Sequence, residues 1–385
     1  MKRIDAAALT QALIRCPSVT PNDAGALELL DSVLVSLGFT CRMVRLQAPG
    51  TAAVDNLYAR LGRNAPNFCF AGHTDVVPPG QVSDWTVDPF GGEIIADRLF
   101  GRGATDMKGA IAAFIAAVSR LLTSVGKPAG SISLLITGDE EGVATNGTRA
   151  MLPLLAKWGE HLDACLVGEP TCAHQLGDVI KIGRRGSLNG QLTVPGNQGH
   201  VAYPERADNP LPRLVRMLDA LLSLPLDQGT THFPPSSLVL TSIDVGNPAT
   251  NVIPAVGTAA FNIRFNPLYT ATGLEIWLRQ RLDAVGGAYL LDLQLSGDAF
   301  LTLPGPLCEL VSRVIERETG LTPDLNTGGG TSDARFIKDL CPVVEFGLPG
   351  GTMHKVDEHL VLTDLDKLVD IYTGILTGYF NQVGA

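Results

Sequence analysis

Short runs of apolar residues, each closed by glycine or polar residues, recur in the first and last parts of the chain. Four of these runs cover residues 67–73, 131–137, 163–169 and 342–346. Continuous apolar runs of this length are typical of strands that are buried on both faces of a sheet. Apolar residues at helical spacing predict helices over residues 6–15, 24–37, 107–122, 306–318 and 364–380. The alternation predicts an α/β fold in which helices cover a mostly parallel sheet.

The middle of the chain has a different order of elements. The patterns there predict β-α-β-β-α-β, over residues 188–194, 211–222, 237–245, 256–265, 273–285 and 288–295. This order is the ferredoxin-like arrangement. At 385 residues, the chain is also long for a single core. We therefore predict one domain formed by residues 1–182 and 296–385, interrupted by an inserted domain at residues 183–295.

Composition and charge narrow the classes of function. The chain has 45% apolar residues and a formal net charge of −10, and nucleic-acid recognition would need a basic face. No apolar run approaches the ~18 residues of a membrane span, and Asp5, Gln11 and Arg15 interrupt any signal-peptide core. Seven cysteines without a CxxC pair suit a reducing compartment. We therefore expect a cytoplasmic protein without nucleic-acid or membrane partners.

Acidic and imidazole side chains lie where the predicted strands of the first domain end. His73 closes the first of the four runs, Glu140 and Glu141 follow the second, Glu169 ends the third, and His354 comes after the fourth. The functional crevice of an open α/β sheet lies beyond the carboxyl ends of its strands, so these residues can converge. Several carboxylates in one crevice repel one another unless cations lie between them. Histidine and carboxylate together suit a divalent metal, and zinc accepts both ligand types.

Taken singly, each motif also has an ordinary structural interpretation. His73, with Asp75 two positions later, is equally a strand-end histidine beside an exposed acid, although Asp75 could accept the second ring N–H of a metal-bound His73. Asp106, between glycines, is expected to be the N-cap of the helix at 107–122. The pair Glu140–Glu141 is either a solvated acidic turn or a functional pair. The buried strand before the pair favours function, in which one acid binds metal and the other takes a proton from water.

Together these residues resemble the motifs of the dizinc amidohydrolases of the aminoacylase/carboxypeptidase type, and the similarity covers nearly the whole chain. The matching segments are 72–78, 85–90, 106–109, 140–141, 168–170 and His354. Four further segments resemble one subgroup of N-acyl amino-acid hydrolases, namely 183–187, 199–204, 251–254 and 330–333. The resemblance implies hydrolysis of the amide bond of an N-acyl amino acid. It also implies a mostly parallel-sheet dizinc hydrolase domain and a homodimer formed through the inserted ferredoxin-like domain.

The resemblance also implies a set of metal ligands. Two divalent ions per chain are expected, with zinc as the first choice and cobalt as an alternative. His73 and Glu169 would hold one ion, Glu141 and His354 would hold the other, and Asp106 would bridge both. A cis peptide bond between Asp106 and Met107 is implied as well.

Roles in catalysis and substrate binding are implied for other residues. Glu140 would be the general base toward a hydroxide that bridges the metals, and Asp75 would orient His73. His200 would cross the dimer to polarise the scissile carbonyl. Substrate contacts are implied for Arg185, Ser187, Tyr203, Asn251, Arg264, Gly330 and Thr331. The chain departs from the pattern at Gly350, where asparagine is common, which puts one substrate contact in doubt.

Three alternatives stay open from the sequence. The first is another member of the class, such as an acetylornithine deacetylase, an aminoacylase or a metallocarboxypeptidase. The second is a dimetal phosphohydrolase, because two-metal sites also serve phosphate esters. The third is a non-catalytic binding protein, against which Glu140 argues, since binding alone needs no unligated base.

Overall fold

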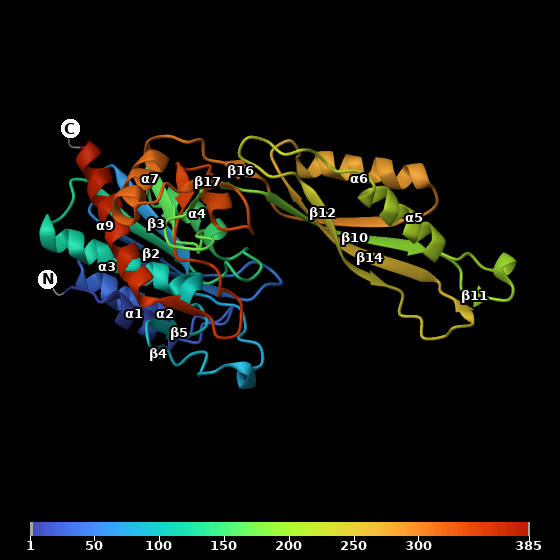
Figure 1. The fold of residues 1–385 in the computed structure, drawn as a ribbon, viewed down its shortest axis with the longest axis horizontal. Helices are drawn as coiled ribbons and strands as arrows, with labels where there is room; N and C mark the ends of the chain where they lie inside the picture. The colour runs from blue at the N-terminus through green and yellow to red at the C-terminus, as the bar shows by residue number, and fades with distance from the viewer. Residues whose placement is uncertain (1–2, 384–385) are drawn as a thin grey trace. The chain divides into compact units, whose positions relative to one another are not determined.

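The computed structural model describes residues 3–383 and divides the chain into two compact units (Figure 1). Unit 1 contains the chain up to Ile182, Thr302–Asn326, and the chain from Ser332 onward; unit 2 contains Gly183–Leu301 and Thr327–Thr331. Unit 2 thus extends past the expected boundary at residue 295. It also takes in a short later segment, because Thr327 Oγ1 donates a hydrogen bond to the main-chain oxygen of His232 at 2.6 Å.

Unit 1 is built on one eight-stranded sheet. Its order is β1 (Thr40–Leu46), β2 (Val54–Leu61), β6 (Ser131–Thr137), β3 (Asn67–His73), β7 (Ala164–Val167), β18 (Val343–Glu345), β8 (Val179–Lys181) and β17 (Asp324–Asn326). The four central strands β6, β3, β7 and β18 are parallel, whereas β1 and β2 at one edge are antiparallel. The four apolar runs of the sequence are these central strands, and the predicted α/β class is confirmed.

Helices cover the sheet of unit 1. They are α1 (Ala6–Ile14), α2 (Ala26–Ser36), α3 (Gly109–Ser124), α4 (Thr148–Lys157), α7 (Pro306–Thr319), α8 (Ala334–Ile337) and α9 (Leu362–Val383). The ring of Phe70 in β3 stacks on Phe114 of α3 at 4.3 Å between centroids and meets Tyr372 of α9 edge-on at 5.9 Å. Helices α3 and α9 therefore pack on the same face of the sheet.

The start of α3 differs from the expectation that Asp106 caps the helix. The helix begins at Gly109, and Asp106 lies in an irregular turn, η2 (Ala104–Lys108). The backbone of Asp106 (φ −122°, ψ 88°) is not helical, so its carboxylate is not placed to cap the first turn of α3. The Asp106–Met107 peptide bond is cis, as expected.

One helical stretch bears on the expectation that no apolar run approaches the length of a membrane span. Among the described residues, Ala104–Ser124 is long and apolar enough to cross a membrane by length and composition. Within the molecule, 83% of this stretch's apolar window is buried.

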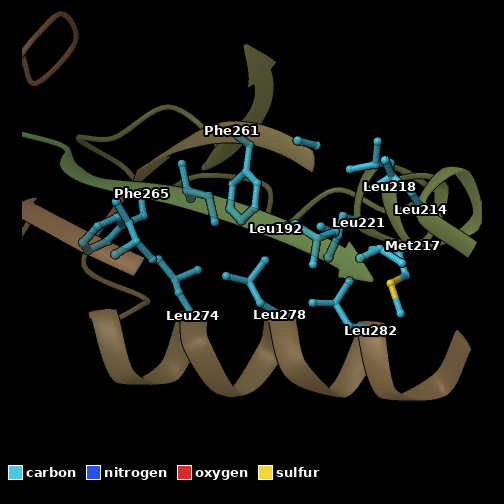
Figure 2. Packing of buried hydrophobic residues seen from close by; sticks show 14 residues of the cluster. Leu192, Leu214, Met217, Leu218, Leu221, Phe261, Phe265, Leu274, Leu278 and Leu282 are labelled. Atoms are coloured by element: carbon cyan, nitrogen blue, oxygen red, sulfur yellow. The ribbon is translucent and has the colours of Figure 1, made fainter. Parts of the chain in front are cut away.

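Unit 2 has the predicted ferredoxin-like order of elements. These are β10 (Gly186–Pro195), α5 (Leu211–Leu222), β12 (Ser237–Asp244), β14 (Val256–Phe265), α6 (Ala271–Val285) and β15 (Leu290–Gly297). The antiparallel sheet runs β12-β14-β10-β15. Its core forms between this sheet and the two helices, where Leu274, Leu278 and Leu282 of α6 point toward the sheet (Figure 2). Two short ladders complete the unit, β9 (Gly183–Arg184) with β16 (Phe300–Leu301) and β11 (Gly199–His200) with β13 (Val252–Ile253).

Candidate metal and catalytic site

The sheet of unit 1 brings together the strand-end residues that the sequence singled out. His73 is the last residue of β3, level with Thr137 at the end of β6. Glu140 and Glu141 follow β6, and Glu169 follows β7. Because β3, β6 and β7 are parallel, these ends lie along one edge of the sheet. His354 comes from the loop after β18 and has φ +60°, an uncommon conformation for a residue other than glycine.

Asp106 lies between the two histidines. Its Oδ1 is 3.3 Å from His73 Nε2, and its Oδ2 is 3.2 Å from His354 Nε2. On the far side of each histidine is a glutamate: His73 Nε2 is 3.8 Å from Glu169 Oε1, and His354 Nε2 is 2.7 Å from Glu141 Oε1. The five expected ligands therefore form two histidine–glutamate pairs that share one aspartate.

The donor atoms fit divalent cations. His73 Nε2 and Asp106 Oδ1 are buried, and neither has a hydrogen-bond partner within the described part of the chain. Buried polar atoms are almost always paired, so two that face each other unpaired are suited to bind a ligand between them. Potential ligand atoms of His73, Asp106 and Glu141 lie within 4.8 Å of one another, as do those of His73, Glu140 and Glu169. Nitrogen and carboxylate oxygen in groups of this size suit zinc and related ions.

Asp75 has a wider role than the expected orientation of His73. The Nδ1 atom of His73 is 2.8 Å from the main-chain oxygen of Asp75 and 3.7 Å from its carboxylate. The main-chain oxygen is thus the nearer partner. The two carboxylate oxygens of Asp75 accept hydrogen bonds from the backbone N–H groups of Glu140 and Glu141, at 3.2 and 3.0 Å. Asp75 therefore positions His73 and both glutamates.

The clustered charges shift the pKa of several site residues. Burial favours the neutral acid at Asp106, but the neighbouring imidazoles of His354 and His73 favour its charged form and hold its pKa well below the usual range. Hydrogen bonds to Asp106 and Glu141 raise the pKa of His354 to about 10. Burial, with the charge of Glu169 adding to it, raises the pKa of Glu140 well above its usual value. Burial also raises the pKa of Asp75 to about 6.

Metal binding is expected to release protons, because a coordinated histidine must be neutral. His354, with a pKa of about 10 in the metal-free protein, carries a proton at about pH 8, and an ion must displace it. Calorimetric titration of metal-free protein with zinc, in two buffers of different ionisation enthalpy, measures the release. Heats that do not depend on the buffer would contradict this prediction, and His354→Ala should release fewer protons.

One acid near the site was not singled out from the sequence. Glu358 is fully buried and accepts a hydrogen bond from the backbone N–H of Asp106 at 3.1 Å. Its sequence signal is weak, because an acid four residues after His354 looks like part of an exposed loop. Gly350, the position that departs from the family pattern, packs closely: a Cβ there would lie 3.0 Å from the main-chain oxygen of Pro170.

Two arginines expected to contact substrate lie together in unit 2. Arg185 directly precedes β10, and Arg264 lies in β14 opposite Ser187. Arg185 Nε and Arg264 Nη1 are buried and have no hydrogen-bond partner among residues 3–383. Burial lowers the pKa of Arg264, and the positive charge of Arg185 lowers it further. Gly330, whose oxygen accepts a hydrogen bond from Arg184 Nη1 at 3.2 Å, belongs to the same unit together with Thr331.

The other expected residues of unit 2 lie past the opposite end of β10 (Figure 1). His200, in β11, is exposed, and its ring centroid is 5.8 Å from that of Tyr203. The main-chain oxygen of Asn251 accepts a hydrogen bond from Val201 N at 3.1 Å. His200 Nδ1 accepts a hydrogen bond from Ala202 N at 3.0 Å, so the neutral ring carries its proton on Nε2. His200 is thus prepared to donate a hydrogen bond outward.

An α/β unit whose strand ends gather two histidines and several carboxylates fits the class of metal-dependent hydrolases. The sequence profile described as peptidase family M20/M25/M40 matches residues 69–378. The chain belongs to this family.

Known proteins from bacteria resemble nearly the whole chain. A succinyl-diaminopimelate desuccinylase of Rhodospirillum centenum is 65% identical over 376 residues, covering 98% of this chain and 97% of that protein. Another succinyl-diaminopimelate desuccinylase, from Parvibaculum lavamentivorans, is 56% identical over 96% of this chain and 94% of its own length.

Solved structures share the fold. An M20-family metallo-carboxypeptidase from Sulfolobus solfataricus superposes with a TM-score of 0.79 at 16% identity, covering 99% of this chain and 100% of that one. A dinuclear metal-binding peptidase of the M20 family from Bacillus subtilis gives a TM-score of 0.70 at 13% identity, covering 98% of each chain. At these identities the likeness concerns the fold alone.

Proposed function

We propose that this protein hydrolyses N-succinyl-LL-2,6-diaminopimelate to succinate and LL-2,6-diaminopimelate, a step of lysine and diaminopimelate biosynthesis. The observation that carries the choice of substrate is the 65% identity, over nearly the full length, to a succinyl-diaminopimelate desuccinylase. Amide hydrolysis itself is supported by the cluster of two histidines and four carboxylates in unit 1.

The cluster is proposed to hold two divalent ions, zinc or alternatively cobalt. His73 and Glu169 would hold the first ion, His354 and Glu141 the second, and the two oxygens of Asp106 one each. Such a pair of ions supplies a nucleophilic hydroxide near neutral pH and polarises the carbonyl under attack.

The remaining steps fall to side chains of the protein. Glu140 takes the proton of the attacking water and returns it to the leaving amine, which its raised pKa favours. His200 Nε2–H donates to the oxygen that becomes negative in the transition state. Arg185 and Arg264, with unpaired guanidinium nitrogens, bind carboxylates of the substrate, since arginine binds carboxylates in bidentate fashion. Ser187, Tyr203, Asn251, Gly330 and Thr331 are proposed as further substrate contacts.

The positions of these groups within unit 2 support a homodimer that shares its sites. Arg185 and His200 are separated by the ten residues of β10, which span about 30 Å at the usual rise of ~3.3 Å per residue. One small substrate cannot reach both ends of that strand. If both residues contact it, they come from different subunits, and we assign His200 to the partner subunit. The seven free cysteines suit the cytoplasm as the place of action.

The proposal is tested by a coupled assay for succinate released from N-succinyl-LL-2,6-diaminopimelate, with protein loaded with zinc or cobalt. N-acetylornithine, other N-acyl amino acids, dipeptides and a phosphomonoester serve as comparison substrates. We expect the highest kcat/KM with the succinylated substrate. Faster hydrolysis of another substrate would reassign the enzyme within the class or outside it.

The arginine pair is expected to control substrate affinity and leave the metals in place. Arg185→Gln or Arg264→Gln removes a hydrogen bond to a charged group, which is worth about 1.5–3 kcal/mol and therefore lowers kcat/KM by roughly 10–100-fold. KM should rise, because the bond is made in the ground state as well. Arg279→Gln, which breaks a surface pair with Glu275 on α6, is the matched control. An unchanged KM in both variants would exclude the proposed contact.

A further inference from the structure

The carboxylate of Glu358 is fully buried and has a complete set of donors in unit 1. Its Oε1 accepts hydrogen bonds from the backbone N–H groups of Thr105 and Asp106, both at 3.1 Å. Its Oε2 accepts from the backbone N–H of Gly103 at 3.1 Å and from Arg102 Nη1 at 2.8 Å. All four donors belong to the segment 102–106, so a single side chain ties down the turn that carries Asp106.

Arg102 completes this buried group. It is 2% exposed, and its guanidinium lies over the ring of Trp85, 5.2 Å from the centroid. A buried carboxylate is tolerated only when charge and hydrogen bonds compensate for the lost water. Glu358 has one counter-charge and three backbone donors, and therefore holds the turn by strong, charge-assisted bonds.

Glu358 also belongs to the loop that carries His354. The loop is closed on itself, since Thr352 Oγ1 donates to the main-chain oxygen of His359 at 2.8 Å. It is anchored beyond Glu358 as well, because His359 pairs with Phe100 in the ladder of β19 (His359–Val361) and β5 (Arg98–Phe100). Asp357, the residue before Glu358, accepts hydrogen bonds from the backbone N–H and the hydroxyl of Thr86, at 2.7 and 2.6 Å.

We propose that Glu358 is a positioning residue for the metal centre, which fixes the Asp106 turn relative to the His354 loop. These two segments supply two of the atoms expected to hold one ion, Asp106 Oδ2 and His354 Nε2, which are 3.2 Å apart. The Glu141 oxygen, from the segment after β6, lies 2.7 Å from His354 Nε2. The His73–Glu169 side is held by the ends of β3 and β7 and depends less on Glu358. The inference rests on the metal site of the proposed function and not on its substrate.

The test is cobalt binding to metal-free Glu358→Gln, followed by calorimetry and by the visible spectrum of the bound ions. The amide oxygen of glutamine can replace one carboxylate oxygen, but its NH₂ group then faces the donors of the other oxygen, either Gly103 N–H and Arg102 or the N–H groups of Thr105 and Asp106. We expect the binding step that fills the His354–Glu141 side to lose about 10–100-fold in affinity, the usual effect of losing a group that supports a metal ligand. The binding step on the His73–Glu169 side should change little. The visible spectrum of the cobalt ion bound on the His354–Glu141 side should shift.

Glu160→Gln is the matched control. Glu160 lies in the loop before β7, at the amino-terminal end of that strand and away from the metal ligands. Its carboxylate forms an ion pair with Arg60 and accepts a hydrogen bond from the Tyr58 hydroxyl at 2.9 Å. If Glu358 only stabilises the fold, both variants lower the midpoint of unfolding and both bind two cobalt ions with wild-type affinity, which would overturn the proposal. Glu358→Asp keeps the charge but shortens the side chain, and should show the same selective loss. If neither Glu358 variant folds while Glu160→Gln does, Glu358 is a folding determinant and the proposal is rejected.

Because the readout uses metal and no substrate, it is independent of the substrate assignment. Selective loss of one cobalt step supports the proposal even if the enzyme hydrolyses a different N-acyl substrate. Wild-type protein that binds no cobalt would refute the metal centre itself.

Discussion

Replacement of Glu140 by alanine is expected to lower kcat by about 10²–10⁴-fold, the usual contribution of a general base, while the protein keeps its metal. Glu140 follows β6, and its backbone N–H is held by the Asp75 carboxylate at 3.2 Å. Its carboxylate is partly buried and near Glu169, which raises its pKa. Such a group takes up a proton readily. Metal analysis and steady-state kinetics on the same preparation measure both effects.

Glu141→Ala is the partner experiment, because the two adjacent acids are expected to divide the work. Glu141 lies 2.7 Å from His354 and is expected to be a metal ligand, so its loss should cost bound metal as well as activity. The geometry admits a ligand role for Glu140 too, since it groups with His73 and Glu169. If Glu140→Ala loses metal and Glu141→Ala retains it, the two roles are reversed.

Mixing two inactive variants is expected to restore activity if His200 acts across a dimer. In a mixed dimer of Glu140→Ala and His200→Ala chains, one site combines an intact Glu140 with the partner subunit's intact His200. The other site lacks both groups. Random exchange between equal amounts of the two chains makes about half of the dimers mixed, and one of their two sites is complete, so activity should recover to roughly a quarter of wild type.

The control for this experiment is a mixture of Glu140→Ala with Glu141→Ala. Both substitutions lie in unit 1 of their own chain, so no complete site can form. Exchange is followed with differently tagged chains. If mixed dimers form and activity stays at the level of the separate variants, His200 does not serve the partner's site.

Much of the central sheet could be predicted because its strands are buried on both faces. A strand such as β3 has every residue buried, so its sequence is a continuous apolar run that stands out from its neighbours. The order β-α-β-β-α-β of unit 2 was readable for a related reason. There one face of each strand packs on helices, and β14 alternates buried and partly exposed residues along its length.

Other features depended on contacts between distant segments. The start of α3 was misplaced because Asp106 between glycines looks like an N-cap, whereas its turn is held by Glu358, which lies 252 residues later in the chain. The sequence predicted only part of the role of Asp75. Its carboxylate also accepts hydrogen bonds from the backbone N–H groups of Glu140 and Glu141, which follow the neighbouring strand β6. The segment Thr327–Thr331 belongs to unit 2, where Thr327 donates a hydrogen bond to His232 and Gly330 accepts one from Arg184.

The sequence by itself determined which residues could form the site and at which ends of which strands they would lie, because burial and strand ends leave a local pattern of apolar and polar residues. Only the tertiary structure decided how these residues face one another: that Asp106 lies between His73 and His354, and that Glu358 fixes the Asp106 turn. The physical reason is that a hydrogen bond between distant segments leaves no periodic trace in either segment. Such contacts can be seen only once the fold has brought donor and acceptor within about 3 Å.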